Sequence, residues 1–126
     1  MKSPIALVVD DDPDIRDVIA YMLELAGFEV HWESNGEAGL ALAVAVRPDV
    51  VLLDWMMPRM SGVEVCSALR ANTDLASVAV IMLTARAQEV DVRRGFDAGA
   101  DDYIVKPFSP KDLVNRVQSV LAQVRK

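Results

Sequence analysis

Short apolar runs alternate with stretches of helical periodicity along the whole chain. After the first run, for example, Ile15, Val18, Ile19 and Met22 recur at every third or fourth position, which is typical of an amphipathic helix. The pattern predicts five strand–helix repeats. The expected strands are Ile5–Val9, Phe28–Trp32, Asp49–Leu53, Val78–Leu83 and Asp102–Val105.

Capping signals predict where the helices begin and end. A short polar side chain at the N-cap accepts a backbone N–H, and proline fits the first helical position. Glycine favours the end of a helix, as at Gly27 and Gly99. The fourth helix is expected over roughly Gln88–Ala98. The expected helix starts are Asp12 with Pro13, the capping boxes Ser34 with Glu37 and Ser61 with Glu64, and Ser109 with Pro110.

The strands are apolar runs rather than alternating ones, which indicates a sheet that is buried on both faces. Strands that alternate with helices form parallel sheets, with right-handed crossovers and a helical layer on each side. We therefore expect an α/β fold, a (βα)5 doubly wound parallel sheet of five strands. The flavodoxin-like strand order 2-1-3-4-5 is expected, with its switch point between the first and third strands.

Composition and charge limit the class of protein. The 126 residues are expected to form one domain, 1–126, and the net charge of -6 argues against direct nucleic-acid binding by it. Cys66 is the only cysteine, so no disulfide forms within the chain. The N-terminus has neither a signal peptide nor a membrane span, and we expect a cytoplasmic protein.

Five side chains with a charge or a hydroxyl stand where the predicted strands end. Because parallel strands end at one edge of the sheet, these groups are expected to meet there. Carboxylates that close together repel, and a bound Mg²⁺ would relieve the repulsion while also taking phosphate oxygens as ligands. The sequence therefore suggests a magnesium and phosphoryl site. Its members are Asp10, Asp11, Asp54, Thr84 and Lys106.

Each of these residues also has an ordinary structural interpretation. The acids fit a solvated loop face, Thr84 fits a helix cap, and Lys106 fits a surface lysine. Asp12, directly before Pro13, is best explained as an N-cap. The joint placement at four strand ends favours the site over these separate explanations.

Five segments between the first strand and the last helix carry a shared pattern. They are Ala6–Asp12, Leu53–Pro58, Ser61-Gly62, Leu83–Arg86 and Gly99–Phe108. In their order and spacing the chain resembles the receiver domains of two-component response regulators. Each segment alone is a weak signal, but all five together are highly specific to that family, and they span nearly the entire chain.

The resemblance implies a role for each residue of the predicted site. Asp54 is expected to be the phosphoacceptor. Asp11 and Asp54 are expected to ligate Mg²⁺ directly, with the backbone carbonyl of Met56, while Asp10 acts mainly through a metal-bound water. Lys106 is expected to pair with Asp54 and then with the phosphoryl group.

The resemblance also implies a switch and its partners. Thr84 is the expected switch hydroxyl, Tyr103 the coupled aromatic, and the bond before Pro107 is expected to be cis. The phosphodonor is expected to be a sensor histidine kinase or a histidine phosphotransfer protein. The output surface is expected on the fourth helix, fifth strand and fifth helix. Such a domain assists its own phosphorylation and dephosphorylation, but it is not a turnover enzyme on an external substrate.

Three other functions are alternatives, and the residues present argue against each of them. An aspartate-based phosphohydrolase normally has a second acid two residues after its nucleophile, where this chain has Met56. A flavin-binding electron carrier would offer hydroxyls and glycine after the first strand, where this chain has Asp10–Asp12. A degenerate receiver that serves only for docking would not need the intact acids, Thr84 and Lys106.

The sequence leaves the assembly open. The chain is either a stand-alone receiver or a piece of a longer regulator. The run Gly99–Arg116 looks most like receivers attached to winged-helix DNA-binding domains, which dimerise through charged pairs on the output surface. However, a position on the fourth helix that is often basic in that subgroup is Val92 here. A homodimer is possible through Asp97, Asp101, Asp112 and Arg116.

Overall fold

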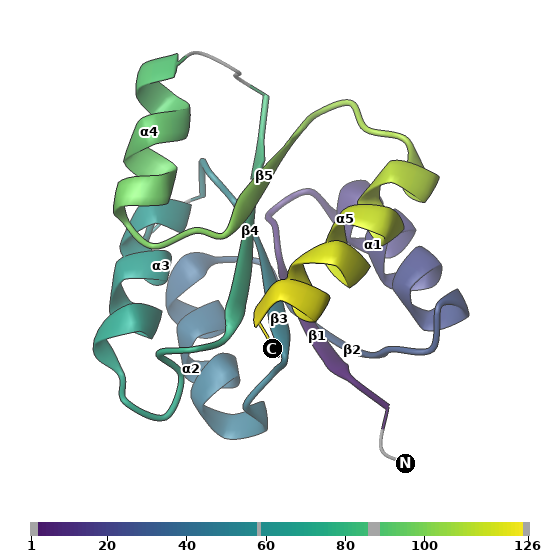
Figure 1. The fold of residues 1–126 in the computed structure, drawn as a ribbon, viewed down its shortest axis with the longest axis horizontal. Helices are drawn as coiled ribbons and strands as arrows, with labels where there is room; N and C mark the ends of the chain where they lie inside the picture. Colours follow the sequence, from purple (N-terminus) through teal and green to yellow (C-terminus); the bar gives the residue numbers. More distant parts are fainter. Residues whose placement is uncertain (1–2, 58, 86–88, 125–126) are drawn as a thin grey trace.

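A computed structural model describes residues 3–57, 59–85 and 89–124, with side chains other than those at 89–92 and 124. Its ten elements alternate strand and helix as predicted (Figure 1). Pro58, Arg86, Gln88 and the side chain of Val92, which the sequence analysis named, lie outside this description. The elements are β1 (Ile5–Val9), α1 (Pro13–Leu25), β2 (Glu29–Glu33), α2 (Gly36–Val46), β3 (Val50–Asp54), α3 (Gly62–Ala71), β4 (Ala79–Thr84), α4 (Glu89–Asp97), β5 (Asp102–Val105) and α5 (Pro110–Val124).

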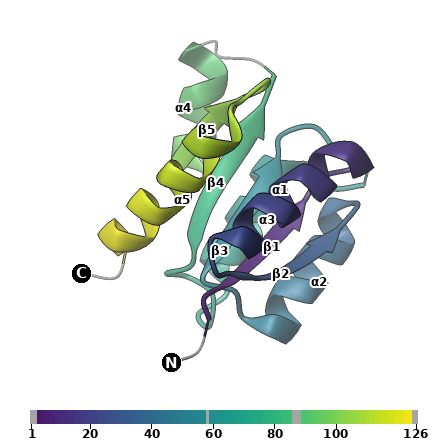
Figure 2. The ribbon, with the colours of Figure 1, turned by 90° about the vertical axis from the view of Figure 1, so that its right-hand side faces the viewer.

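The strands form one parallel sheet in the order β2-β1-β3-β4-β5 (Figure 2). This confirms the predicted fold class and strand order. β1 and β3 are neighbours, with Val9 opposite Leu53, although a helix, a strand and another helix separate them in the sequence. The residues that follow β1 and β3 therefore reach the same end of the sheet.

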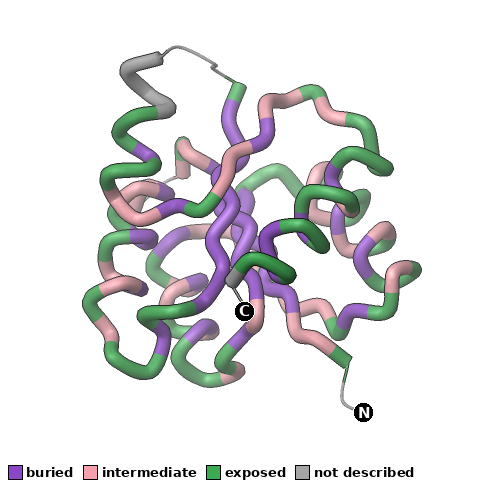
Figure 3. The backbone as a smooth tube through the Cα atoms, viewed as in Figure 1, coloured by how far each residue is buried: buried purple, intermediate pink, exposed green. Residues whose placement is uncertain are grey.

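Two helical layers cover the sheet, with α1 and α5 on one face and α2, α3 and α4 on the other (Figure 1). Alternate residues of each strand enter the two cores, so Val8 packs with α1 and α5 whereas Leu7 packs with α2 and α3. The middle strands are buried along their whole length, as the continuous apolar runs predict (Figure 3). None of the described helices has the length and apolar character that a bilayer span requires.

The predicted helix caps agree with the structure at two places, and several strand boundaries differ by one residue: β3 (Val50–Asp54) and β4 (Ala79–Thr84) each begin and end one residue later than predicted. Asp12 caps α1, and Ser61 forms a capping box with Glu64 at α3, as predicted. The prediction of Ser34 as the cap of α2 was wrong, because the side chain of Asn35 accepts the N–H of Ala38 at 2.8 Å.

Strand β2 begins at Glu29 and not at Phe28. The N–H of Phe28 donates to the carbonyl of Leu23, so this residue belongs to the end of α1. The Phe28 side chain is buried in the core under α1 and α5. The N–H of Glu29 donates to the carbonyl of Pro4, the residue before β1, and this is the first backbone hydrogen bond from this segment to the neighbouring strand. The strand therefore starts one residue later than its apolar pattern indicates.

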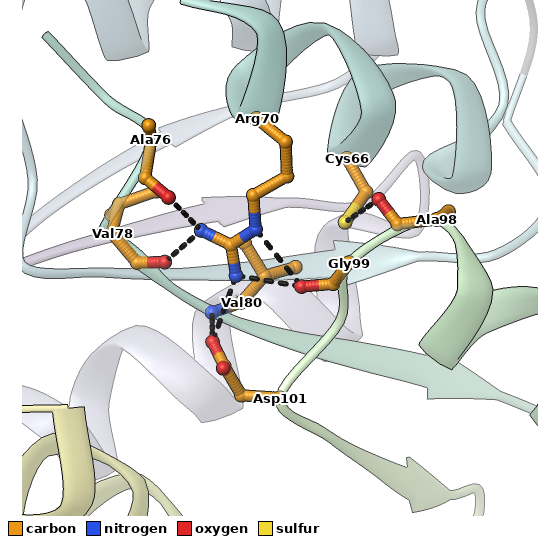
Figure 4. A network of polar contacts seen from close by, with 8 residues as sticks. All are labelled: Cys66, Arg70, Ala76, Val78, Val80, Ala98, Gly99 and Asp101. Carbon is orange, nitrogen blue, oxygen red and sulfur yellow. Dashed lines mark hydrogen bonds and ion pairs between the residues drawn. The ribbon is translucent and has the colours of Figure 1, made fainter. Parts of the chain in front are cut away.

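A polar network joins α3 to the amino ends of β4 and β5 (Figure 4). The guanidinium of Arg70 donates to the carbonyls of Ala76, Val78 and Gly99, and to the carboxylate of Asp101 at 2.9 Å. The same Asp101 oxygen accepts the N–H of Val80 at 2.8 Å. We call these residues the Arg70 cluster. It fixes the starts of both strands from one side chain.

Candidate metal and phosphoacceptor site

Three carboxylates converge at the carboxyl end of the sheet. Asp10 and Asp11 follow β1, and Asp54 is the last residue of β3. One oxygen atom from each side chain lies within 4.8 Å of the others. Asp10 and Asp54 are buried, whereas Asp11 is exposed. The predicted convergence of these acids is therefore confirmed.

Lys106 approaches this group from the loop after β5. Its Nζ donates to Asp10 Oδ2 at 3.0 Å and to Asp54 Oδ1 at 3.2 Å. The backbone N–H of Lys106 donates to the carbonyl of Thr84, which aligns the ends of β4 and β5. The bond between Lys106 and Pro107 is cis, as the resemblance implied. We call Asp10, Asp11, Asp54 and Lys106 the acid pocket.

The charges in the acid pocket do not balance, because three carboxylates share one ammonium. Burial, followed by the charge of Asp10, raises the pKa of Asp54 to about 6, although Lys106 opposes this shift. Burial disfavours the charged form of Lys106, but its hydrogen bond to Asp10 and the charge of Asp54 raise its pKa overall. The lysine therefore stays positive, and the pocket retains an excess of negative charge at neutral pH.

The donor set of the pocket fits a magnesium ion. Carboxylate oxygens are hard ligands, and Mg²⁺ typically takes one or two of them while it keeps several waters and binds phosphate oxygens. The exposed carboxylate of Asp11 gives the group an opening to solvent. Met56, the other predicted ligand through its backbone carbonyl, lies in the loop after β3 with its side chain 70% exposed.

The two predicted switch residues lie on neighbouring strands. Thr84 is the last residue of β4 and is buried at the same end of the sheet as the acids. Tyr103 lies on β5 and is half-buried. Its ring meets the edge of Phe96 from α4, with the ring centroids 5.9 Å apart and the planes at 81°. The structure thus links Tyr103 to α4 through an aromatic contact.

Two residues near the acids were not predicted to matter individually. Gly62 was quoted only as part of a motif, yet a Cβ at this position would collide with the carbonyl of Asp54. Its N–H also donates to the carbonyl of Trp55 at 3.1 Å, which closes the loop after the acceptor. Arg16 gave no signal beyond its place in the first turns of the helix after the acids, and it contacts the backbone of Asp10.

The comparisons with known proteins agree with this geometry. The model of the response regulator receiver domain matches residues 6–118. The chain is 44% identical to the DNA-binding dual master transcriptional regulator RpaA of Synechocystis, over 94% of this chain and 49% of that protein. It is also 44% identical to the phosphate regulon transcriptional regulatory protein PhoB of Pseudomonas aeruginosa, over 96% and 53%. The chain therefore spans about half the length of the curated relatives it matches.

Solved structures show the same fold. A putative response regulator from Chloroflexus aurantiacus matches with a TM-score of 0.91 and 35% identity, over 96% of this chain and 99% of that one. Chemotaxis protein CheY4 of Vibrio cholerae matches with a TM-score of 0.90 and 34% identity, over 94% and 98%. With the family model and these relatives in agreement, the chain belongs to the response regulator receiver domains, the signalling switches of two-component systems.

Proposed function

We propose that this receiver accepts a phosphoryl group on Asp54 in a Mg²⁺-dependent transfer from a phosphohistidine. The donor is a sensor histidine kinase or a histidine phosphotransfer protein. The observation that carries the proposal is the meeting of Asp10, Asp11 and Asp54 within 4.8 Å, with Lys106 bonded to two of them. The carboxylates of such a pocket can bind a divalent cation, and the cation together with Lys106 can then balance the charge of a phosphoryl dianion.

In the proposed reaction a carboxylate oxygen of Asp54 attacks the phosphorus. The new O–P bond forms as the P–N bond to histidine breaks, and the electron pair of that bond returns to the imidazole. Lys106 is already within hydrogen-bond reach of Asp54, so its ammonium is placed to pair with a phosphoryl oxygen.

Asp11, Asp54 and the carbonyl of Met56 would hold the magnesium, with Asp10 acting through a water. The ion would neutralise negative charge on the phosphoryl oxygens during the transfer. Asp10 is buried and bonded to Lys106, which suits a residue that orients its neighbours more than one that binds the ion directly.

We propose that phosphorylation shifts the packing at Thr84 and Tyr103. The new phosphoryl oxygens accept hydrogen bonds, and the hydroxyl of Thr84 turns toward them. Tyr103 then occupies the space that this movement leaves, and its contact with Phe96 carries the change to α4. The response is a population shift in favour of the packing that binds the phosphoryl group better, and it alters the α4-β5-α5 surface.

A homodimer through α4-β5-α5 remains part of this proposal. In the single chain, Arg116 already pairs with Asp102 at 3.3 Å and with Asp112 at 3.2 Å, and Asp101 pairs with Arg70. A dimer would therefore exchange pairs made within one chain for pairs between two chains, so we expect only a weak association before phosphorylation.

The assembly of the whole regulator is proposed from its relatives. RpaA carries DNA binding in its name, and this chain spans about half of that protein. We propose that residues 1–126 form one receiver domain whose α4-β5-α5 surface controls either an attached DNA-binding domain or a separate partner protein.

The test is labelling by acetyl phosphate in the presence and absence of Mg²⁺, followed by intact-mass spectrometry. One phosphoryl group should appear only with Mg²⁺, and hydroxylamine should remove it, as expected of an acyl phosphate. Asp54→Asn should abolish the label, whereas Asp97→Asn, an exposed acid on α4, should keep it. Hydroxylamine-sensitive labelling that persists in Asp54→Asn contradicts the assignment of the acceptor.

A further inference from the structure

Arg16, on the first turns of α1, contacts the acid pocket from outside. Its Nη1 donates to the backbone carbonyl of Asp10 at 3.3 Å. Its guanidinium lies over the ring of Trp32 on β2, 4.2 Å from the ring centroid. A guanidinium over an indole face is a cation–π contact, which favours one orientation of the side chain. Arg16 thus bridges an exposed aromatic on the edge strand and the first acid of the pocket.

The contact completes the hydrogen bonding of Asp10. Its N–H donates to the carbonyl of Glu33, its Oδ1 accepts the N–H of Asp12 at 2.9 Å, and its Oδ2 accepts Lys106. The carbonyl is the remaining polar group, and it accepts Arg16. This carbonyl belongs to the peptide that joins Asp10 to Asp11. Arg16 therefore fixes the plane of the peptide from which Asp11 extends.

This arrangement has an energetic cost. Nε of Arg16 is buried and has no hydrogen-bond partner among the described residues. A buried donor without a partner costs about 1–3 kcal/mol. Trp32 is 52% exposed, so its ring adds little to the core and serves mainly to cover the guanidinium. A surface arginine could avoid this cost by turning into solvent, so the half-buried placement of Arg16, with its Nε covered, needs a reason other than solubility.

We propose that Arg16 is a positioning residue for the metal site, and that Trp32 holds it in place. By fixing the peptide between Asp10 and Asp11, Arg16 orients the Asp11 carboxylate for Mg²⁺. This inference rests on the proposed function, because it concerns the same pocket. Outer groups that orient metal ligands typically change metal affinity by about 10–100-fold when removed.

The alternative explanation, a purely electrostatic effect, predicts the opposite sign. If Arg16 acted only as a positive charge near the pocket, its removal would strengthen the binding of a cation. If it positions Asp11, its removal weakens binding although the local charge becomes more negative. Mg²⁺ affinity therefore separates the two explanations without any measurement of phosphorylation.

The experiment is a Mg²⁺ titration followed by backbone amide NMR shifts near Asp11. Arg16→Met keeps an unbranched apolar stem and should raise the Mg²⁺ dissociation constant about tenfold. Trp32→Leu keeps every atom of Arg16 and should raise it by a smaller factor. Arg94→Met removes the same charge from an exposed position on α4 and should leave the constant unchanged.

A second readout, amide hydrogen exchange, measures how often the hydrogen bonds around Asp10 open. The N–H of Asp12 donates to Asp10 Oδ1, so Arg16→Met should increase its rate of hydrogen exchange. Unchanged or tighter Mg²⁺ binding in Arg16→Met overturns the inference. If circular dichroism shows that this variant does not fold, an unchanged constant in Trp32→Leu overturns it instead. If the wild-type protein binds no Mg²⁺, the proposed function fails, and the exchange rate alone decides whether Arg16 positions this peptide.

Discussion

The acid pocket and the Arg70 cluster are polar groups at opposite ends of the same sheet. In each of them a basic side chain bonds to aspartate: Lys106 to Asp10 and Asp54, and Arg70 to Asp101. In the Arg70 cluster, five hydrogen bonds satisfy the guanidinium, which matches its five N–H donors. One positive charge faces one carboxylate there, Asp101. The cluster is complete without a ligand.

The acid pocket is not complete in this sense. Three carboxylates lie together there, Lys106 bonds to only two of them, and burial together with Asp10 raises the pKa of Asp54 to about 6. A folded chain gains nothing in stability from such an excess of like charge. The comparison contrasts balanced polar groups, which can stabilise the fold at one end of the sheet, with unbalanced groups at the other end, where we propose a cation and a phosphoryl group bind.

The largest expected effect concerns the Arg70 cluster. Arg70→Met should lower the free energy of unfolding by about 3 kcal/mol, because it leaves carbonyls and the Asp101 carboxylate without their donor. Urea unfolding measures this. Arg94→Met, at an exposed site, should change stability by less than about 0.5 kcal/mol. Loss of acetyl phosphate labelling in folded Arg70→Met would show that the two ends of the sheet are not independent.

The acid pocket should respond in the opposite direction. Asp54→Asn should raise the free energy of unfolding at pH 7 without Mg²⁺ by about 2–3 kcal/mol. The sign follows from linkage: a carboxyl with a raised pKa in the folded state destabilises the fold as pH rises through about 6, where it ionises. The amide has no such charge, and Lys106 keeps its bond to Asp10. Asp97→Asn serves as the control for loss of an exposed acid. A less stable Asp54→Asn would mean that the Asp54 carboxylate stabilises the fold, as Asp101 does at the other end of the sheet.

The affinity of the pocket for Mg²⁺ should depend on pH. Protonation of Asp54 below a pH of about 6 would remove the charge of a proposed ligand, so the affinity should fall by up to about tenfold per pH unit there and level off above it. Titrations monitored by NMR at a series of pH values measure this. Asp54→Asn should bind Mg²⁺ more weakly and show a flatter profile, and an unchanged profile would assign the titration to another group.

The smallest expected effect belongs to Asp101. Asp101→Asn keeps an oxygen that can accept from Arg70 and from the N–H of Val80, but it loses the charge. The expected loss of stability is about 1 kcal/mol or less, because the pair is partly exposed. Urea unfolding of this variant beside Arg70→Met tells how much of the cluster depends on charge. A loss as large as that of Arg70→Met would mean that the ion pair, and not the carbonyl contacts, stabilises the cluster.

Much of the fold was predictable because its signals are local. The apolar runs gave the strands, and the caps at Asp12 and Ser61 were confirmed, since an N-cap bonds to a backbone only a few residues away. The cap of α2 was wrong because Ser34 and Asn35 are adjacent and both suit the position. Which of the two becomes the N-cap depends on where the chain leaves β2, and the pairing of β2 within the sheet sets that point.

The site was predictable in part for the same reason. Acids and a lysine at strand ends, together with a parallel sheet, implied that Asp10, Asp54 and Lys106 would meet, and they do. The roles assigned to these residues, and those assigned to Asp11, Met56, Thr84 and Tyr103, stay predictions. The contact of Arg16 could not be predicted from the sequence. No sequence pattern indicates which backbone carbonyl an arginine side chain on a helix will bond to.

The sequence by itself determined the order of the elements, the strands that are buried on both faces, and the family to which the motifs point. The order of the elements and the buried strands follow from periodicity and caps, which act within one or two turns of chain, whereas the family follows from the resemblance of five short motifs. Only the tertiary structure decided which charges are balanced: Arg70 with Asp101, thirty-one positions away, and Lys106 shared between Asp10 and Asp54. Burial and proximity set the energy of a charge, and both arise only when distant segments pack together.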